Sequence, residues 1–271
     1  MAAPIIHFDL DSPYELAKEQ IRFYRENGFV RLKKVLPAEV LEHYRNEISA
    51  KVQELNTERL PLEQRSVYGR AFLQVTNLWT KSEIVKEFVT GKRLARIAAE
   101  LMGCRGVRLY HDQALYKEPG GGFTPWHADQ YYWPVNTDNI VTAWIPLQDT
   151  PVEMGTPAFS PGSFRIQEGR DLEIGEDSET RLQTTLKEYG VDEGPFALGD
   201  VSFHSGWTFH RAGPNQTVRP REAMTIIYMD LDARLIQPKN KHQEADRQAW
   251  CPGVGIGQII DSPLNLVLYS R

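Results

Sequence analysis

The sequence has little cysteine and no long apolar run, and these two absences exclude several classes of protein. Only Cys104 and Cys251 occur among 271 residues, and they form no CxxC pair. We therefore expect a reducing compartment, with neither a disulfide framework nor a cysteine-bound structural zinc. The longest uncharged apolar stretches, such as 224–229, are far shorter than the roughly 20 residues of a membrane-spanning helix.

An excess of positive charge is also missing. Lys and Arg total 31 against 36 Asp and Glu, which gives a net charge of -5. Non-specific nucleic-acid binding is disfavoured, because it depends on basic side chains that displace counterions from phosphate. The opening segment MAAPIIHFDLD carries acidic residues where a secretory signal carries basic ones, so we expect a cytoplasmic protein with no nucleic-acid and no membrane partner. No sequence feature indicates an oligomeric state.

The composition that remains is that of an ordinary globular protein. Hydrophobic residues make up 41% of the chain and charged residues 25%, which excludes a disordered or collagen-like polypeptide. A chain of this length buries roughly 75% of the surface that its unfolded form exposes. One large domain or two small ones would fit this length.

The first hundred residues are typical of a helical segment. Pro13 follows Ser12 as a helix start, and Gly28 and Gly103 act as helix stops. We expect helices from about 13 to 27, from 37 to 55, between 82 and 91 and from 93 to 102, with a short strand over 29–32. The second helix shows the three-or-four spacing of one buried face, made by Val40, Leu41, Tyr44, Ile48, Val52 and Leu55.

The pattern changes to short strands after residue 106. Period-two runs separated by Gly- and Pro-containing turns predict strands over 107–116, 140–147, 201–204, 223–229 and 264–268. Many short strands of this kind indicate a sandwich or barrel, with the helices packed outside a β core. The polar segment 163–195 is long for a connection, and it is equally consistent with a lid and with a surface loop. Leu182, Leu186 and Tyr189 suggest one short helix inside it.

Three side chains carry the chemistry that the sequence suggests. His127 and Asp129 are two residues apart, so they point the same way from an extended segment, and His210 follows far along the chain. Two imidazoles and one carboxylate on one face of a metal form the facial triad of non-haem Fe(II) oxygenases. A polar network inside a β-barrel is the alternative interpretation. His204 competes with His210 as the third ligand, but it lacks the GPN turn that follows His210.

An arginine stands where a 2-oxo acid would need one. Arg221 begins the run REAMTIIYM, and strand alternation places it on one side with Ala223, Thr225 and Ile227. A planar guanidinium pairs bidentately with a carboxylate, so Arg221 suits the far carboxylate of a bound 2-oxo acid. Arg219 is the competing candidate, in the turn TVRP, where solvation is expected.

The longer segments that contain these residues resemble a known family. TPWHADQYYWP, IVTAWIPLQD and GDVSFHSGWTFHRAGPNQTVRPREAMTIIY are similar to the phytanoyl-CoA dioxygenase family of Fe(II)- and 2-oxoglutarate-dependent oxygenases. RENGFVRLKKVLP resembles the N-terminal helix and strand of that family. The resemblance implies a double-stranded β-helix (a cupin-like jelly roll) with N-terminal helices packed outside. We therefore expect one domain over 1–271, with a mainly helical region over 1–103, a jelly-roll core over 104–271 and a lid insertion over 163–195.

The resemblance also implies roles for single residues. His127, Asp129 and His210 match the iron ligands. The residues expected to contact 2-oxoglutarate are Arg221, Trp144, Gln113 and Lys117. Beside the metal motif, the residues expected to shape a substrate pocket are Trp126, Tyr131, Tyr132 and His204.

Two departures from the family pattern concern the co-substrate. Ala128 replaces a glutamine found in many members, and Ala212 replaces a serine found in some, so each removes one polar contact. Asp129 itself favours hydroxylation or another oxidation over halogenation, because related halogenases have a small residue there to admit halide.

The predicted reaction is hydroxylation of a C–H bond in a small organic substrate. Fe(II), 2-oxoglutarate and O2 are the expected cofactor and co-substrates, and succinate and CO2 are the expected products. No basic cluster suggests a CoA or nucleotide handle on the substrate. Two alternatives stay open at this point: a non-catalytic jelly-roll protein that binds small molecules, and a metal-dependent cupin-like enzyme that is not an oxygenase.

Overall fold

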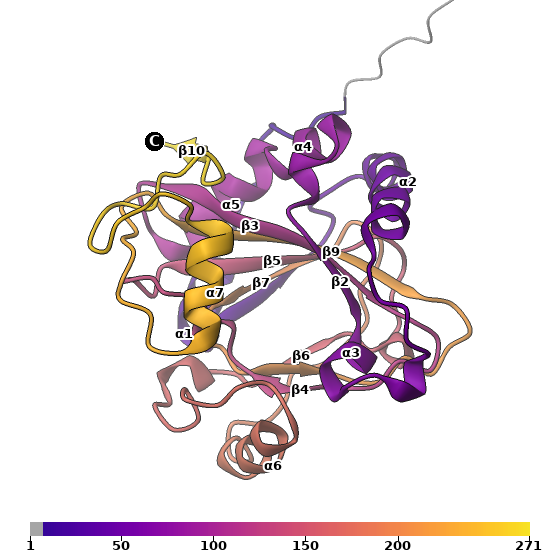
Figure 1. Ribbon diagram of the computed structural model, residues 1–271. Coiled ribbons are helices and arrows are strands. Elements are labelled where there is room, and N and C mark those ends of the chain that lie inside the picture. The colour runs from indigo at the N-terminus through magenta and orange to yellow at the C-terminus, as the bar shows by residue number, and fades with distance from the viewer. Residues whose placement is uncertain (1–7) are drawn as a thin grey trace, which may run out of the picture.

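The computed structural model describes residues 8–271. Residues 1–7, which include His7 and begin the segment MAAPIIHFDLD, lie outside the described part of the chain. Within it, two antiparallel sheets lie one above the other (Figure 1). The larger sheet contains β1 (Phe29–Leu32), β2 (Leu73–Thr76), β3 (Gly106–Lys117), β5 (Ile140–Pro146), β7 (Val201–Ser205), β9 (Arg221–Asp230) and β10 (Val267–Ser270). The smaller sheet contains β4 (Thr124–His127), β6 (Pro157–Phe159) and β8 (His210–Ala212).

The order of the strands is that of a jelly-roll core. The larger sheet runs β1-β7-β5-β9-β3-β10, with β2 paired to β3, and the smaller sheet runs β4-β8-β6. Neighbouring strands in both sheets are far apart in sequence, as in β5 beside β9 and β4 beside β8. A sheet-rich core with flanking helices confirms the predicted fold class.

Strand β9 shows how alternation divides the interior. Met224, Ile226 and Tyr228 are fully buried in the main core, between the larger sheet and the helices. Ala223 and Ile227 belong to separate clusters on the other side of the strand. Successive strand residues face opposite ways, so alternate side chains of β9 pack against the helices and the others face the space between the two sheets.

The N-terminal helices cover the outer face of the larger sheet (Figure 1). They are α1 (Lys18–Asn27), α2 (Ala38–Leu55), α4 (Glu83–Val89) and α5 (Lys92–Met102). The predicted apolar face of α2 is confirmed, since Val40, Leu41, Tyr44, Ile48 and Val52 are all buried. No helix among residues 8–271 is long and apolar enough to cross a membrane.

The first helix begins later than Pro13, at Lys18. Residues 13–17 are not helical, and two contacts hold the backbone of the residue before them. Arg93 donates from Nε to the Ser12 carbonyl at 2.8 Å, and the Asp9 carboxylate accepts from the Ser12 N–H at 2.9 Å. The helix start predicted at Pro13 is therefore not formed, and Arg93 of α5 binds the Ser12 carbonyl instead.

Several short helices lack a repeated apolar period in the sequence. They are α3 (Val67–Ala71), α6 (Glu176–Thr185), α7 (Lys241–Trp250) and the 3-10 helices η1 (Leu62–Gln64), η2 (Leu78–Thr80), η3 (Asp129–Tyr132), η4 (Val152–Met154) and η5 (Ser163–Arg165). Of these, only α6 was expected, from Leu182 and Leu186, which are indeed buried, whereas Tyr189 is exposed beyond its end. The last strand begins at Val267 rather than at residue 264.

Candidate active site

The three predicted ligands meet on the smaller sheet. His127 ends β4, Asp129 begins η3 directly after it, and His210 begins β8. The antiparallel register pairs His127 with His210, so the two imidazole rings lie side by side with their centroids 4.1 Å apart. Strand pairing thus brings together two residues that are far apart in sequence.

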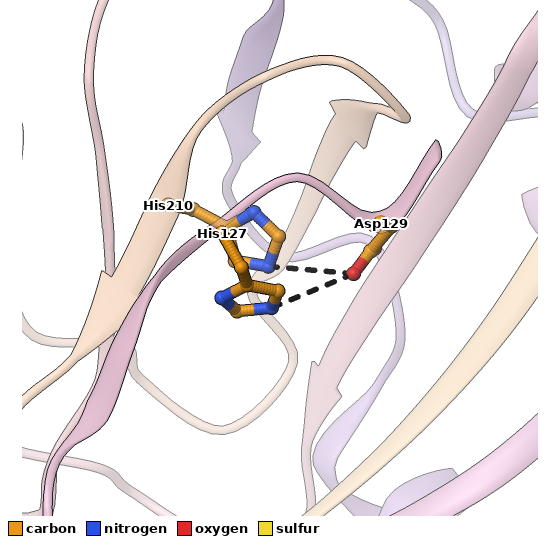
Figure 2. A group of neighbouring side chains, drawn as sticks. All are labelled: His127, Asp129 and His210. Atoms are coloured by element: carbon orange, nitrogen blue, oxygen red, sulfur yellow. Dashed lines mark ion pairs between the residues drawn. The ribbon is translucent and has the colours of Figure 1, made fainter. Parts of the chain in front are cut away.

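The donor atoms of these residues converge on one point (Figure 2). Asp129 Oδ1 lies 3.6 Å from His127 Nε2 and 3.8 Å from His210 Nε2. Each ring turns its other nitrogen to a backbone carbonyl, His127 Nδ1 to Pro125 at 2.8 Å and His210 Nδ1 to Thr208 at 3.0 Å. A protonated Nδ1 leaves the Nε2 lone pair free for a metal, so this donor set fits a divalent iron ion.

The charges of the cluster also suit a metal. Burial raises the pKa of Asp129, but the nearby His210 and hydrogen bonds with His127 and His204 outweigh it and hold that pKa well below its usual value. Burial and the neighbouring His127 and His204 hold the pKa of His210 well below its usual range. The carboxylate is therefore ionised and the His210 imidazole neutral, which are the forms that bind metal ions.

His204 lies beside His210, with ring centroids 4.4 Å apart, but it contacts the second oxygen of Asp129. Its Nε2 contacts Asp129 Oδ2 at 3.2 Å, and the Thr142 hydroxyl donates to the same oxygen at 3.0 Å. One carboxylate oxygen thus faces the two ligand imidazoles while two buried side chains hold the other. His204 orients Asp129 and does not join the cluster as a third imidazole.

Arg221 is buried without a counter-charge. It is 3% exposed, and it takes part in no ion pair within residues 8–271. Its guanidinium donates to the Gly155 and Leu115 carbonyls at 3.0 and 3.2 Å, its Nε has no partner, and it lies 5.5 Å from the centre of the Trp144 ring. Burial lowers its pKa to about 10. A buried unpaired cation is costly, so the site fits a carboxylate ligand.

The glycine at 155 permits this arrangement. Its φ is +78°, and a Cβ there would lie 2.3 Å from the Gly213 carbonyl oxygen. Only glycine therefore lets this loop approach closely enough for its carbonyl to meet Arg221. Arg219, the competing candidate, is exposed in the preceding turn.

A single cavity of about 670 Å³ joins these features. Of the sequence-predicted residues, its wall includes the three cluster residues together with Arg221, Trp144, Gln113, Tyr132 and His204. Three further predicted residues lie elsewhere. Trp126 packs beneath α6, and the Tyr131 backbone carbonyl accepts a hydrogen bond from Gln243 of α7 at 3.0 Å. Lys117 is fully buried, and its Nζ donates to the Gly122 carbonyl and to the hydroxyl of Thr124, which lines the cavity.

Sequence reasoning missed one whole side of this wall. It is formed by α3, β2, the 163–195 segment and α7, through Tyr68, Phe72, Gln74, Thr76, Glu173, Ile174, His242, Asp246 and Trp250. A signal for α7 did exist, because the Asn240 side chain caps the helix by accepting from the His242 and Gln243 N–H groups. The helix has too few buried residues to show a clear apolar period.

The comparison with known proteins agrees with this geometry. The sequence profile described as "Phytanoyl-CoA dioxygenase (PhyH)" matches residues 24–223. The chain belongs to the phytanoyl-CoA dioxygenase family. The chain is similar in sequence to the probable alpha-ketoglutarate-dependent hypophosphite dioxygenase of Stutzerimonas stutzeri and to the human peroxisomal phytanoyl-CoA dioxygenase. The first is 25% identical over 79% of both chains, and the second is 24% identical over 84% of this chain and 73% of its own.

Solved structures of similar proteins extend the comparison. The carbocyclase SnoK from nogalamycin biosynthesis superposes with a TM-score of 0.78 at 27% identity, over 95% of this chain and 100% of its own. The epimerase SnoN, in complex with Fe3+, alpha ketoglutarate and nogalamycin RO, gives a TM-score of 0.77 at 25% identity, over 93% and 98%. This member of the phytanoyl-CoA dioxygenase family is therefore an iron- and 2-oxoglutarate-dependent dioxygenase, an oxidoreductase that uses O2. The oxygenase prediction is confirmed over its two alternatives.

Proposed function

We propose that this dioxygenase hydroxylates a C–H bond of a small organic molecule. Substrate, 2-oxoglutarate and O2 would give the hydroxylated product, succinate and CO2, with one oxygen atom entering the alcohol and the other succinate. One observation carries the proposal: the His127–Asp129–His210 cluster and the unpaired Arg221 face the same cavity. A site with both features has a place for the metal and a place for the oxo acid.

The iron would be held by His127 Nε2, Asp129 Oδ1 and His210 Nε2. Bound iron supplies activation of O2 at the expense of 2-oxoglutarate, and the protein supplies geometry. The Pro125 and Thr208 carbonyls orient the two imidazoles, and His204 and Thr142 fix the second carboxylate oxygen. Three protein ligands on one side leave the other side free for co-substrates.

The 2-oxoglutarate would extend from the iron towards Arg221. Its far carboxylate would pair with the guanidinium, beside the Trp144 ring, and Gln113 would line the same region of the wall. Lys117 would support this co-substrate site from behind its wall. It pairs in register with Arg221 across β3 and β9, and it fills the space behind Thr124, which lines the cavity.

The segment 163–195 would act as a lid on one jelly-roll domain. Glu173 and Ile174 line the cavity, and the Ile174 N–H donates to the Tyr132 hydroxyl at 3.0 Å. Its helix α6 is anchored to the metal-bearing sheet, since Glu179 accepts from the Trp126 N–H at 2.8 Å. A segment fixed at one end and covering the cavity at the other is suited to closing over substrate.

An anaerobic titration tests this function directly. Fe(II) and then 2-oxoglutarate are added to the purified protein, and the visible charge-transfer band of the chelate is recorded. We expect a band that is absent in His210→Ala, followed by succinate when O2 is admitted. Folded protein that gives neither band nor succinate would refute the proposal. Identification of an alcohol among the products, with one atom from labelled O2, would establish hydroxylation.

A further inference from the structure

The side of the cavity formed by α3, β2, the 163–195 segment and α7 contains a carboxylate with no cationic partner among residues 8–271. Asp246 of α7 lines the cavity, and its Oδ2 accepts from the Tyr110 hydroxyl at 3.1 Å. Within residues 8–271, the ion pairs of α7 join Lys241 and His242 to Glu173, and Arg247 to Glu244, so none involves Asp246. A carboxylate taken out of water without a counter-ion is unfavourable, and a ligand cation would remove that cost.

Aromatic rings line the same cavity as Asp246. The rings that line it, besides Trp144 beside Arg221, are Tyr68, Phe72, Tyr132, Trp133 and Trp250. Two of them are held in place by neighbours: Trp250 stacks on His111 with centroids 4.8 Å apart, and Trp133 meets Tyr110 edge-on at 5.8 Å. Faces of Trp and Tyr rings attract cations, and quaternary ammonium groups are bound in cages of this kind.

We propose that Asp246 and these rings bind an ammonium group of the substrate. The proposal rests on the proposed function, because it assumes that the molecule oxidised at the iron enters this cavity. The chemical class is an organic cation, such as a protonated or quaternary amine, with a hydrocarbon portion that reaches the iron. The cavity is within the roughly 300–1,000 Å³ typical of small-molecule sites, so 2-oxoglutarate and such a substrate fit together.

The same wall is poorly suited to an anionic substrate. Two guanidinium groups line it, and Arg221 is reserved for 2-oxoglutarate. The other, Arg211, is paired with Glu179 at 3.4 Å and lies over the Trp126 ring. Glu173 also lines the cavity, paired with His242 and Lys241, and no lysine lines the cavity among residues 8–271. The relative named as a hypophosphite dioxygenase acts on an oxyanion by its name, whereas among residues 8–271 the cavity lining offers no lysine or arginine free to receive one besides Arg221.

Burial agrees with this assignment. It raises the pKa of Asp246 to about 7, against hydrogen bonds from Tyr110 and Trp250 that lower it, and no neighbouring cation contributes. Burial chiefly raises the pKa of Tyr68 of α3, and the charges of Asp129 and Asp246 add to it, so both carboxylates lie near this ring. A positive group on a ligand would therefore stabilise the ionised form of this carboxylate.

Choline and its neutral isostere 3,3-dimethyl-1-butanol test the site. They differ only in the charged nitrogen, and binding to the anaerobic Fe(II)–2-oxoglutarate protein can be followed by calorimetry and by fluorescence of the tryptophans in the wall. We expect choline to bind at least 10-fold more tightly. Asp246→Asn should bring the ratio close to 1, and Trp250→Leu should weaken choline several-fold while the carboxylate remains.

Glu244→Gln is the matched control, because Glu244 is on the same helix and does not line the cavity. It should keep the full preference for choline. Equal binding of the two compounds to the wild type, no choline binding, or an unchanged preference in folded Asp246→Asn would each overturn the proposal. The charge-transfer band of the wild type is read in the same samples. A band and succinate without choline preference refute the cation site alone, whereas a missing band refutes the proposed function.

Discussion

The cavity has two regions that are built in different ways. The region around the metal cluster and Arg221 is made from paired strands, where β4 meets β8 and β3 meets β9. The region around Asp246 is made from α3, α7 and the 163–195 segment, held by side-chain contacts such as Glu173 with His242. Strand register fixes atoms to within hydrogen-bond tolerances, whereas helices and loops change without disturbing the sheets. The sheets therefore position the residues for the reaction chemistry, and the helices and the 163–195 segment form the region where we propose that substrate binds.

The largest effect should come from removing a ligand in the strand-built region. His210→Ala leaves two donors, and loss of even an outer-shell partner costs about 10- to 100-fold in metal affinity. We expect Fe(II) affinity to fall by more than about 100-fold, measured by anaerobic metal titration. His242→Ala, in the other region, is the control and should keep the wild-type metal affinity. Equal metal affinity in His210→Ala would show that this histidine is not a ligand.

Arg221→Ala should have the next largest effect, on the co-substrate alone. Losing a charge-assisted hydrogen bond costs about 1.5–3 kcal/mol, which is roughly 10- to 150-fold in 2-oxoglutarate affinity. Titration of the charge-transfer band measures it. The exposed Arg219 provides the matched control, and Arg219→Ala should titrate as wild type. A larger effect from Arg219 than from Arg221 would reverse the assignment.

His204→Ala tests the orientation of Asp129. Removing the contact to Asp129 Oδ2 should lower Fe(II) affinity by about 10-fold, at the low end for outer-shell partners, because Thr142 still holds that oxygen. His204→Gln should recover some of the loss, since its amide also donates. Identical metal affinities in all three proteins would mean that His204 only fills space.

The buried Lys117 predicts a dependence of stability on pH. Burial, aided by Arg221, lowers its pKa from 10.5 to about 6, so between these values the unfolded chain binds more protons than the folded one. The free energy of unfolding should therefore rise with pH across this window. Urea denaturation at several pH values should show a shallower rise for Lys117→Met than for wild type. An unchanged slope would mean that Lys117 keeps its charge when buried.

The smallest effect on stability should come from the attached region. Glu173→Gln breaks the contact of Glu173 with His242 and Lys241, and partly exposed ion pairs of this kind contribute about 0–1 kcal/mol. Hydrogen exchange should nevertheless become faster within 163–195, while β4 and β8 stay protected. Equal protection of the segment in both proteins would argue against its role as a lid.

How much the sequence predicts depends on the length of each element. The long strands β3, β5 and β9 and the helix α2 were found because an apolar period repeats several times within each. The three strands of the smaller sheet and β2 were missed, and each has only three or four residues, too few for a period to repeat. The equally short β1 was found because Gly28 marks its start. Yet the smaller sheet holds the metal cluster, and His127, Asp129 and His210 were found by their spacing and chemistry. The division into one domain with a lid stays a prediction.

The sequence by itself predicted the reaction class, which the family comparison then confirmed. The evidence was a histidine and an aspartate two residues apart, a distal histidine, and an arginine on an alternating strand. Each of these patterns lies within a short segment, so it can be recognised without the tertiary structure. Only the tertiary structure decided which side chains share a wall. Asp246, Glu173 and Tyr68 come from three distant segments, and Trp126 and Tyr131 turn away although they flank the metal motif. Those outcomes depend on helix docking and on which face each side chain takes, and no spacing along the chain encodes them.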